Sequence, residues 1–314
     1  NYEKGTIELD GKEYKLLDKN FPTIDPKKPY ALTKEEEDIM ERLERAFENC
    51  EKLQRHMHFL LNKGGLYKVY NGNLLYHGCV PLKEDGNLKS VRIFGRAYKG
   101  KGLYEVLESY VRKGFYAMDP KEKERGKDIM WYIWLSENSP LFGKDKMATF
   151  ERYFLSEKET HKEKKNPYYL LLEDEKVVEK ILKEFGLENE DAHIINGHVP
   201  VKCKDGENPV KCGGKVLVID GGFSKAYQKE TGIAGYTLIY NSYGLILAAH
   251  KPFESTEAAI EKESDIHSDS TVVKRTLERK KVEDTDVGKE LKEQISDLEV
   301  LLAAYRSGVI AERM

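Results

Sequence analysis

Apolar positions recur along this chain with two periods, which together predict a mixed α/β fold. A period near 3.6 residues predicts an amphipathic helix over residues 173–185 and a long last helix over residues 286–307. An earlier helix is expected to open at the capping box Thr33-Lys34-Glu35-Glu36 and to run through residue 61. Shorter helices are expected at residues 102–113, 255–260 and 271–279.

Strands are expected where apolar and polar residues alternate between turn signals. Asn71-Gly72 joins residues 66–70 to residues 73–77 and is the strongest hairpin signal of the chain. The apolar runs at residues 193–196 and 215–220 predict buried strands. Hairpins are also expected within residues 5–17 and over residues 235–250, a charged loop at residues 121–127, and either a helix or a strand at residues 129–135.

The composition limits the classes of protein to which the chain can belong. It has 314 residues, 34% of them charged, and a formal net charge of −3, without the basic excess of a general nucleic-acid-binding protein. No apolar run approaches the ~20 residues of a membrane-spanning helix, and no signal peptide follows Asn1. Four cysteines are too few for a disulfide scaffold. We therefore expect a cytoplasmic protein with reduced thiols and no membrane or nucleic-acid partner.

Two histidines follow apolar strands at glycine-containing turns. Residues 194–202, I-I-N-G-H-V-P-V-K, place His198 at the carboxyl end of a strand, where α/β folds hold their ligands. Residues 74–82, L-L-Y-H-G-C-V-P-L, place His77 in the same way. Either histidine taken alone is as well explained by a buried, hydrogen-bonded role. The two sequences, H-G-x-x-P followed by G-H-x-P, resemble the last histidine motifs of the calcineurin-like metallophosphoesterases.

Three further stretches make the resemblance more specific. They are F-G-K-D-K-M-A-T-F-E-R-Y-F at residues 142–154, H-K-E-K-K-N-P-Y-Y at residues 161–169, and residues 216–243, which begin V-L-V-I-D-G-G-F-S-K-A-Y-Q. They resemble the class III fructose-1,6-bisphosphatases of bacteria, along nearly the whole chain but over only the later portion of that family's length. The resemblance implies the later part of a metallophosphoesterase α/β/β/α sandwich, with an inserted segment and a helical C-terminal extension.

The same resemblance implies an activity and a metal. The family hydrolyses fructose 1,6-bisphosphate to fructose 6-phosphate and phosphate, a gluconeogenic step, with a dinuclear centre for which Mn²⁺ is the expected ion. It assigns His77 and His198 as ligands of one of the two metal ions. The other superfamily ligands come from D-x-H, G-D-x-x-D-R-G and G-N-H-E, and the last two motifs do not occur here. D-x-H occurs at residues 191–193 and 265–267, but neither copy follows an N-terminal strand.

A complete active site is therefore not expected from this chain alone. A catalytic metal needs at least three protein ligands, and two histidines do not supply them. The bridging aspartate, the asparagine ligand and the general-acid histidine are expected upstream, in a missing N-terminal part of the same protein. We expect that part to be a partner of this chain, and we assign no catalytic residue here.

Three cations between the histidine motifs are candidate contacts for the sugar bisphosphate. The unreacting phosphate needs a charge-assisted clamp, and arginine makes bidentate contacts with phosphate better than lysine does. Arg152, Lys144 and Lys146 are the residues we assign to substrate binding. The alternative is that they are solvated, or that they pair with Asp145 and Glu151.

Four segments follow from these assignments. Residues 1–81 carry the first histidine motif on a hairpin, a helix and a strand, and residues 82–170 are an inserted aromatic and basic segment, a candidate substrate lid. Residues 171–254 complete the catalytic core with the second histidine motif, and residues 255–314 form the helical extension. The Asp220-Gly221-Gly222 sequence either faces the site or forms only a sharp turn.

Two alternative functions stay open. The chain is either part of another metallophosphoesterase, such as a protein or dinucleotide phosphatase, or a non-catalytic C-terminal module that binds a partner. The last helix carries one apolar face, which is typical of a packing or homo-oligomer surface. That face consists of Leu291, Ile295, Leu298, Leu301, Leu302 and Tyr305.

Overall fold

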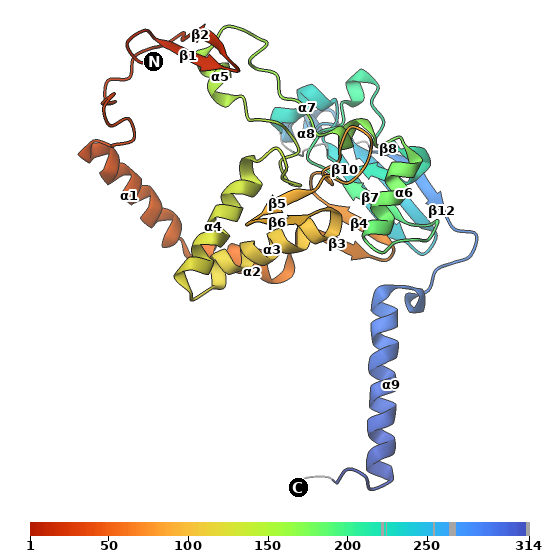
Figure 1. The fold of residues 1–314 in the computed structure, drawn as a ribbon. Helices are drawn as coiled ribbons and strands as arrows, with labels where there is room; N and C mark the ends of the chain where they lie inside the picture. Colours follow the sequence, from red (N-terminus) through yellow and green to blue (C-terminus); the bar gives the residue numbers. More distant parts are fainter. Residues whose placement is uncertain (221–222, 224, 254, 264–267, 312–314) are drawn as a thin grey trace. The chain divides into compact units, whose positions relative to one another are not determined.

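The computed structural model describes residues 1–220, 223, 225–253, 255–263 and 268–311 (Figure 1). It contains both helices and strands, which confirms the α/β class, and it divides into two compact units. The first unit consists of Asn1–Leu66, Ser90–Tyr98 and Gly102–Asn166, and the second of Tyr67–Lys89, Lys99–Lys101 and Pro167–Met314. Each unit is described by itself below.

The first unit begins with the predicted hairpin and with a capped helix. Strands β1 (Thr6–Leu9) and β2 (Lys12–Lys15) pair antiparallel across a turn at Asp10-Gly11, where both residues have positive φ. Thr33 caps α1 (Lys34–Glu48) with the full capping box: its hydroxyl accepts from the Glu36 amide, and the Glu36 carboxylate accepts from the Thr33 amide.

The single helix expected through residue 61 is instead two helices. Asn49 ends α1, because its side-chain amide and its backbone N–H both donate to the carbonyl oxygen of Arg45. Cys50 is extended, and α2 (Glu51–Lys63) then begins. Asparagine competes with helical hydrogen bonding through its own side chain, which explains the break. None of the residues of α1 is buried, so the predicted apolar stripe does not face a core there.

The prediction of a charged loop at residues 121–127 is wrong. That segment is the first half of α4 (Pro120–Leu135), which also decides residues 129–135 in favour of a helix. Asp119 is the N-cap and accepts from the Glu122 amide, and Pro120 occupies the first helical position, where proline is favoured. The caps therefore outweighed the run of charges, which is only the exposed face of the helix.

Helices α3 and α4 build the core of the first unit on a short hairpin. The hairpin is β5 (Val91–Ile93) and β6 (Arg96–Tyr98), and α3 spans Gly100–Tyr116. The buried core residues are Val91, Ile93, Leu103, Leu107, Ile129 and Ile133. The helices touch where Gly126 meets the backbone of Gly114, an approach that leaves no room for a Cβ. The short helix α5 (Thr149–Phe154) follows on a loop.

The second unit contains the sheet that carries both histidines. Its strand order is β3-β4-β7-β9-β8, with β3 at Tyr67–Tyr70, β4 at Asn73–Tyr76, β7 at His193–Asn196, β9 at Val216–Val218 and β8 at Val210–Lys211. The predicted Asn71-Gly72 hairpin joins β3 to β4. Strands β4, β7 and β9 are parallel neighbours. Helix α6 (Glu175–Glu184) confirms the amphipathic helix predicted over residues 173–185.

A second sheet contains a third correction to the predicted elements. Strands β10 (Gly235–Asn241) and β11 (Gly244–His250) form the expected hairpin, and β12 (Ser268–Arg275) pairs antiparallel with β11. Residues 271–279 were expected to be helical, but the β-branched run Thr271-Val272-Val273 pairs as a strand. Tertiary pairing therefore overrides the helical period in this stretch.

The remaining elements of the second unit are short, except the last helix. Helices α7 (Lys225–Thr231) and α8 (Thr256–Glu261) precede α9 (Asp286–Arg306), and single 3₁₀ turns are η1 (Pro167–Leu170), η2 (Cys203–Asp205), η3 (Cys212–Gly214) and η4 (Val282–Asp284). The predicted helices at residues 255–260 and 286–307 are thus confirmed. In the part of the chain that the structure describes, no helix has both the length and the apolar character needed to cross a membrane.

Candidate metal-binding site

Three side chains follow the carboxyl ends of the three parallel strands. His77 comes directly after β4, His198 two residues after β7, and Asp220 two residues after β9. The carboxyl ends of parallel strands lie at the same edge of a sheet, which is where open α/β folds bind their ligands. The sheet register pairs Leu75 with Ile195 and Asn196 with Val218, so the three ends are level.

The imidazoles of His77 and His198 meet at this edge. His77 Nε2 lies 3.0 Å from His198 Nδ1, and the ring centroids are 4.9 Å apart with an interplanar angle of 74°. His77 is exposed and His198 is half-buried. At this distance the two ring nitrogens are within hydrogen-bonding reach of each other.

A strained turn aims His198. The Val199 amide donates to the carbonyl oxygen of Gly197 at 2.8 Å, which closes a γ-turn with His198 at its centre. The φ of His198 is +68°, the value of the rare form of that turn, and few non-glycine residues adopt it. Such strain persists where the surroundings determine the conformation, and it concentrates at functional sites.

Hydrogen bonds join the two histidine-bearing turns. The Gly197 amide donates to the carbonyl oxygen of His77 at 2.9 Å, and the buried Asn196 side chain donates to the carbonyl oxygen of Gly78 at 3.1 Å. A Cβ built on Gly197 would lie 3.7 Å both from the His77 carbonyl oxygen and from Asp220 Oδ2. The strand ends are therefore held together independently of any bound ion.

The geometry of the two nitrogens fits two ligands of one cation. At metal–nitrogen distances of about 2.1 Å, two nitrogens on one ion are separated by roughly 3.0–3.4 Å, depending on the coordination angle. The observed 3.0 Å falls in that range. Imidazole nitrogen suits divalent metals such as zinc and iron, whereas manganese favours carboxylate and water oxygens as its other ligands. The described residues nevertheless contain no group of three or more His, Cys, Asp or Glu side chains that could hold a metal, so they fit two ligands of an incomplete sphere.

Buried tyrosine hydroxyls and a cysteine thiol surround the turn that carries His77. Residue patterns in the sequence did not assign a role to these groups. The Tyr76 and Tyr168 hydroxyls are 2.7 Å apart, and burial raises the pKa of Tyr168 far above its ordinary value. Burial also raises the pKa of Cys79 to about 12, so that thiol stays neutral. The pKa of Tyr169 is raised by burial first, then by the charges of its neighbours, Asp220 among them. These groups are a neutral, packed support for the turn at His77.

The D-x-H sequence at residues 191–193 lies at the other end of β7. His193 is the first residue of that strand, while His198 follows its last. His193 is buried, and burial together with the charge of Lys274 lowers its pKa to about 4. Asp191 forms an ion pair with Lys274. This copy of the motif is a structural feature of the strand's amino end, and the copy at residues 265–267 lies outside the described residues, as do Gly221 and Gly222.

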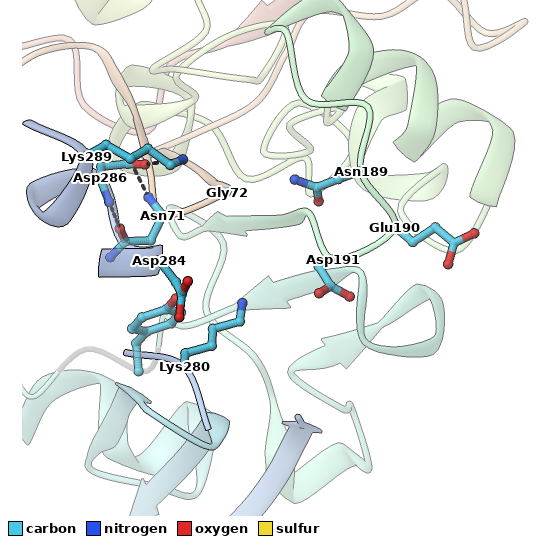
Figure 2. Close-up of a pocket in the computed structure, with 10 residues that line it drawn as sticks. Asn71, Gly72, Asn189, Glu190, Asp191, Lys280, Asp284, Asp286 and Lys289 are labelled. Carbon is cyan, nitrogen blue, oxygen red and sulfur yellow. Dashed lines mark hydrogen bonds and ion pairs between the residues drawn. The ribbon is translucent and has the colours of Figure 1, made fainter. Parts of the chain in front are cut away.

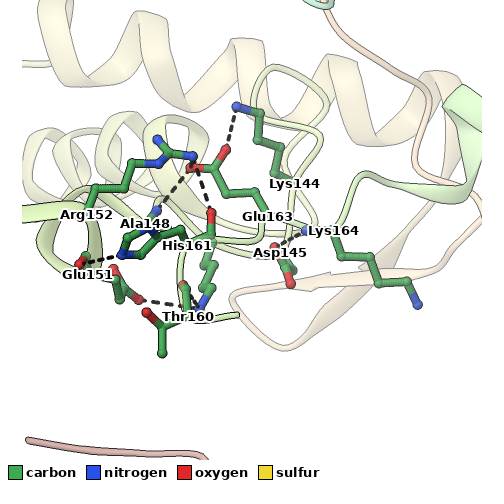
Figure 3. Close-up of polar contacts among 10 residues, drawn as sticks. Lys144, Asp145, Ala148, Glu151, Arg152, Thr160, His161, Glu163 and Lys164 are labelled. Carbon is green, nitrogen blue, oxygen red and sulfur yellow. Dashed lines mark hydrogen bonds and ion pairs between the residues drawn. The ribbon is translucent and has the colours of Figure 1, made fainter. Parts of the chain in front are cut away.

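The three cations assigned to substrate binding lie in the first unit and pair with acidic residues. Figure 3 shows Lys144 and Arg152 on either side of Glu163. Glu163 pairs with Lys144 at 2.9 Å and with Arg152 at 2.9 Å, and it also accepts from the Ala148 amide. Burial would raise the pKa of Glu163, but the hydrogen bonds from Lys144 and Ala148 and the nearby charges outweigh it and hold that pKa below its ordinary value.

Lys146 has a separate set of partners. Its ammonium group lies 3.4 Å from the Glu151 carboxylate and donates to the carbonyl oxygen of Thr160 at 3.0 Å. His161 Nε2 lies 3.0 Å from the carbonyl oxygens of both Glu151 and Leu155, so this nitrogen carries the proton. Each assigned cation thus has an acidic partner. Lys146 pairs with Glu151, as the alternative interpretation allowed, whereas the other two pair with Glu163. Their contact with substrate stays a prediction.

Comparison with known proteins agrees with the resemblance. The profile of the family described as Firmicute fructose-1,6-bisphosphatase matches residues 1–307. A relative from Alkaliphilus metalliredigens (strain QYMF), named fructose-1,6-bisphosphatase class 3, is 57% identical over 316 residues, which cover 100% of this chain and 48% of the relative.

Two clostridial proteins with the same name give the same picture. The one from Clostridium novyi (strain NT) is 57% identical over 314 residues, and the one from Clostridium botulinum (strain Hall) is 56% identical over 313 residues. They cover 100% and 99% of this chain, and the chain covers 47% of each of them. The chain therefore spans about half the length of these curated relatives, and no solved structure matches it significantly. Because the family profile matches residues 1–307 of its 314, the chain belongs to the Firmicute fructose-1,6-bisphosphatase family.

Proposed function

We propose that this chain is the later part of a metal-dependent phosphatase that hydrolyses fructose 1,6-bisphosphate to fructose 6-phosphate and phosphate in gluconeogenesis. Family membership supports this proposal, as do relatives named fructose-1,6-bisphosphatase class 3. The observation that carries it is the convergence of His77 Nε2 and His198 Nδ1 to 3.0 Å at the carboxyl edge of the parallel strands.

His77 and His198 would hold one cation of a dinuclear centre, for which Mn²⁺ is the expected metal. Bound divalent ions would supply a water of lowered pKa and would stabilise charge on the phosphoryl oxygens. To bind the ion, this chain would present two neutral imidazoles, with Nε2 of His77 and Nδ1 of His198 free of protons. The bridging aspartate, the asparagine ligand and the general-acid histidine would come from the part of the protein that this chain lacks.

Arg152 is the strongest candidate for a contact with the unreacting phosphate. Its side chain is 52% exposed, and its planar fork carries five N–H donors, more than its contacts with Glu163 and the His161 carbonyl use. A phosphate dianion would compete with the Glu163 carboxylate for Arg152 and for Lys144. Lys146, paired with Glu151, would contribute a further positive charge.

The architecture that we infer is the later part of a metallophosphoesterase α/β/β/α sandwich. The core would comprise residues 1–81 and 171–254, interrupted by residues 82–170 as a candidate substrate lid and extended by residues 255–314. The two sheets and their packing through Ile195, Leu217 and Leu245 support a layered core. We also infer a cytoplasmic location, since the four cysteines are free thiols.

Two alternatives carry some support. One is that the chain is a non-catalytic module, since the described residues do not complete a metal site. The other is that the longer protein is a metallophosphoesterase for a different phosphomonoester, since the histidine motifs alone do not distinguish substrates. The same set of assays separates all three functions.

The test is a phosphatase assay with Mn²⁺ on the intact protein and on this chain alone. The intact protein should hydrolyse fructose 1,6-bisphosphate with a higher kcat/KM than other sugar phosphates, phosphopeptides or dinucleotides, and the chain alone should be inactive. His77→Ala and His198→Ala should each lower kcat/KM by more than about 100-fold, because loss of a ligand exceeds loss of a ligand's support. His56→Ala, at an exposed position of α2, is the matched control.

Three outcomes count against the proposal. Turnover by this chain alone would show that the ligands are complete within it. Full activity of both histidine variants would show that His77 and His198 do not contribute to an active site. A preference for another phosphomonoester would favour the second alternative.

A further inference from the structure

Helix α9 exposes a long apolar stripe. Gly288 is the one residue of this helix that is buried, and all 21 of its residues belong to the described part of the chain. Leu298 is 63% exposed and Ile295 is 55% exposed. The stripe consists of Leu291, Ile295, Leu298, Leu302 and Tyr305, with Leu301 beside it. An exposed stripe of this length on a soluble protein indicates an interaction surface.

Hydrogen bonds hold the start of α9 against the β3–β4 turn of the second unit (Figure 2). The Asn71 amide donates to the Asp286 carboxylate at 2.7 Å, and the Asp286 amide donates to the Asn71 side chain at 2.9 Å. Thr285 caps the helix, and Gly288 lies against the carbonyl oxygen of Val282 in η4. These contacts fix the first turn beside a polar pocket of about 490 Å³ and leave the stripe from Leu291 onward uncovered.

The stripe has the spacing of a coiled-coil seam. From Leu291 to Ile295, Leu298, Leu302 and Tyr305 the intervals are 4, 3, 4 and 3 residues. Over two heptads this spacing fits the narrow seam of a coiled coil, and Leu301 at g widens the apolar face on one side. In heptad notation Ile295 and Leu302 are at a, and Leu291, Leu298 and Tyr305 are at d. A helix with the same repeat would match this surface.

We propose that α9 pairs antiparallel with α9 of a second copy of this chain. In that register Ile295 packs against Leu298 of the partner subunit, and Leu302 packs against Leu291 of the partner subunit. The two helices then overlap along their whole apolar length. Tyr305 lies over η4 of the partner, where Val282 is 66% exposed.

The charges beside the seam favour the antiparallel arrangement. Lys292 and Glu299 occupy e positions, and in the register above Lys292 faces Glu299 of the partner subunit twice, by symmetry. The Lys292 ammonium group also lies 3.2 Å from the Glu283 carboxylate of its own chain, so it would bridge two carboxylates. A parallel pair would instead place g-position Gln294 opposite Glu299, and Leu301 opposite Arg306, which gives no ion pair. Charge complementarity thus selects a second copy, antiparallel, as the occupant of the stripe.

Sedimentation equilibrium of this chain and of the intact protein tests the pairing. Both should show a dimer, and Leu298→Glu should convert it to a monomer with an unchanged helical circular-dichroism signal, since Leu298 is exposed within one copy. Lys292→Glu or Glu299→Lys alone should each raise the dissociation constant by about tenfold, because two attractive contacts become repulsive. The double variant should restore the original constant. Glu293→Lys, on the opposite face of the helix, is the control.

The contradicting outcomes are equally specific. A monomer at all concentrations overturns the proposal, and so does a dimer that Leu298→Glu leaves intact. If Leu298→Glu lowers the melting temperature of the intact protein without changing its stoichiometry, the stripe is covered by another part of the same polypeptide. If the charge-reversal double variant is as weak as the single variants, the antiparallel register is wrong.

Discussion

The side-chain amide of Asn196 donates a hydrogen bond to the carbonyl oxygen of Gly78, at 3.1 Å and out of contact with solvent. Gly78 follows His77, and Asn196 precedes the turn that carries His198. This contact and the neighbouring hydrogen bond from the Gly197 amide to the His77 carbonyl oxygen connect the ends of two strands. The histidines that follow these strands are 121 residues apart in the sequence. The two imidazoles are thus positioned by their backbones before any cation binds.

Replacing Asn196 with alanine should loosen both turns. The carbonyl oxygen of Gly78 would lose its partner in a buried position, at a cost of about 1–3 kcal/mol in the free energy of unfolding. Support of a metal ligand is worth about 10–100-fold in metal affinity, so Mn²⁺ binding to the intact protein should weaken by a similar factor. Urea unfolding and Mn²⁺ titration measure the two effects. Asn20→Ala, at an exposed loop position, should change neither value, and an Asn196→Ala protein with wild-type metal affinity would show that the contact does not position the site.

Replacing Gly126 with alanine should separate α4 from α3. A Cβ at this position would overlap the backbone of Gly114, which cannot move aside as a flexible side chain would. Overpacking of this kind costs about 1–3 kcal/mol. Thermal unfolding should show the loss, whereas Gly102→Ala, where a Cβ would meet open space, should be neutral or slightly stabilising. Equal melting temperatures for the two variants would contradict the close helix contact.

The fold was predictable from sequence wherever local signals and tertiary packing agreed. Asn71-Gly72 fixed a hairpin, and Thr33 with Glu36 fixed the start of a helix, because each signal is a complete local hydrogen-bonding arrangement. The prediction of a loop at residues 121–127 was wrong because the run of charges was given more weight than the helix N-cap at Asp119. The prediction of a helix at residues 271–279 was wrong because β12 is defined by its pairing with β11, which no local pattern shows.

Acidification should destabilise the second unit through His193. Burial lowers the pKa of His193 to about 4, whereas an unfolded histidine titrates near 6.5. Between these values the unfolded chain binds a proton that the native chain does not, so stability falls as pH falls from 6.5 to about 4, by about 3 kcal/mol in total. Urea unfolding at pH 7 and pH 4.5 should show this loss in the wild type and a smaller one in His193→Gln. His56→Gln should retain the wild-type dependence, and an identical slope in His193→Gln would exclude His193 as the cause.

The meeting of the two histidines was predictable from the sequence, but the groups that support them were not. His77 and His198 were found because each follows an apolar strand at a glycine-containing turn, and parallel strand ends converge. The buried hydroxyl pair of Tyr76 and Tyr168 joins segments 92 residues apart, and an aromatic residue in sequence does not reveal its hydrogen-bond partner. Glu163 was missed for the same reason, since one of its cationic partners, Lys144, lies in a loop and the other, Arg152, lies in α5.

Replacing Arg152 with alanine separates a substrate contact from a structural ion pair. If Arg152 binds the unreacting phosphate, KM for fructose 1,6-bisphosphate should rise by about 10–100-fold in the intact protein with little change in kcat, since charge-assisted hydrogen bonds contribute about 1.5–3 kcal/mol. Arg55→Ala, exposed on α2, is the matched control. Unchanged kinetics with a lower melting temperature would leave Arg152 as a partner of Glu163 alone.

The most direct test of a shared cation at His77 and His198 is electron spin echo modulation of Mn²⁺ bound to the intact protein. Two histidine nitrogens should modulate the echo of one manganese ion, and His77→Ala or His198→Ala should each remove one of them, while His56→Ala leaves both. Bound Mn²⁺ without histidine modulation, or modulation that survives both substitutions together, would show that these imidazoles do not bind the metal.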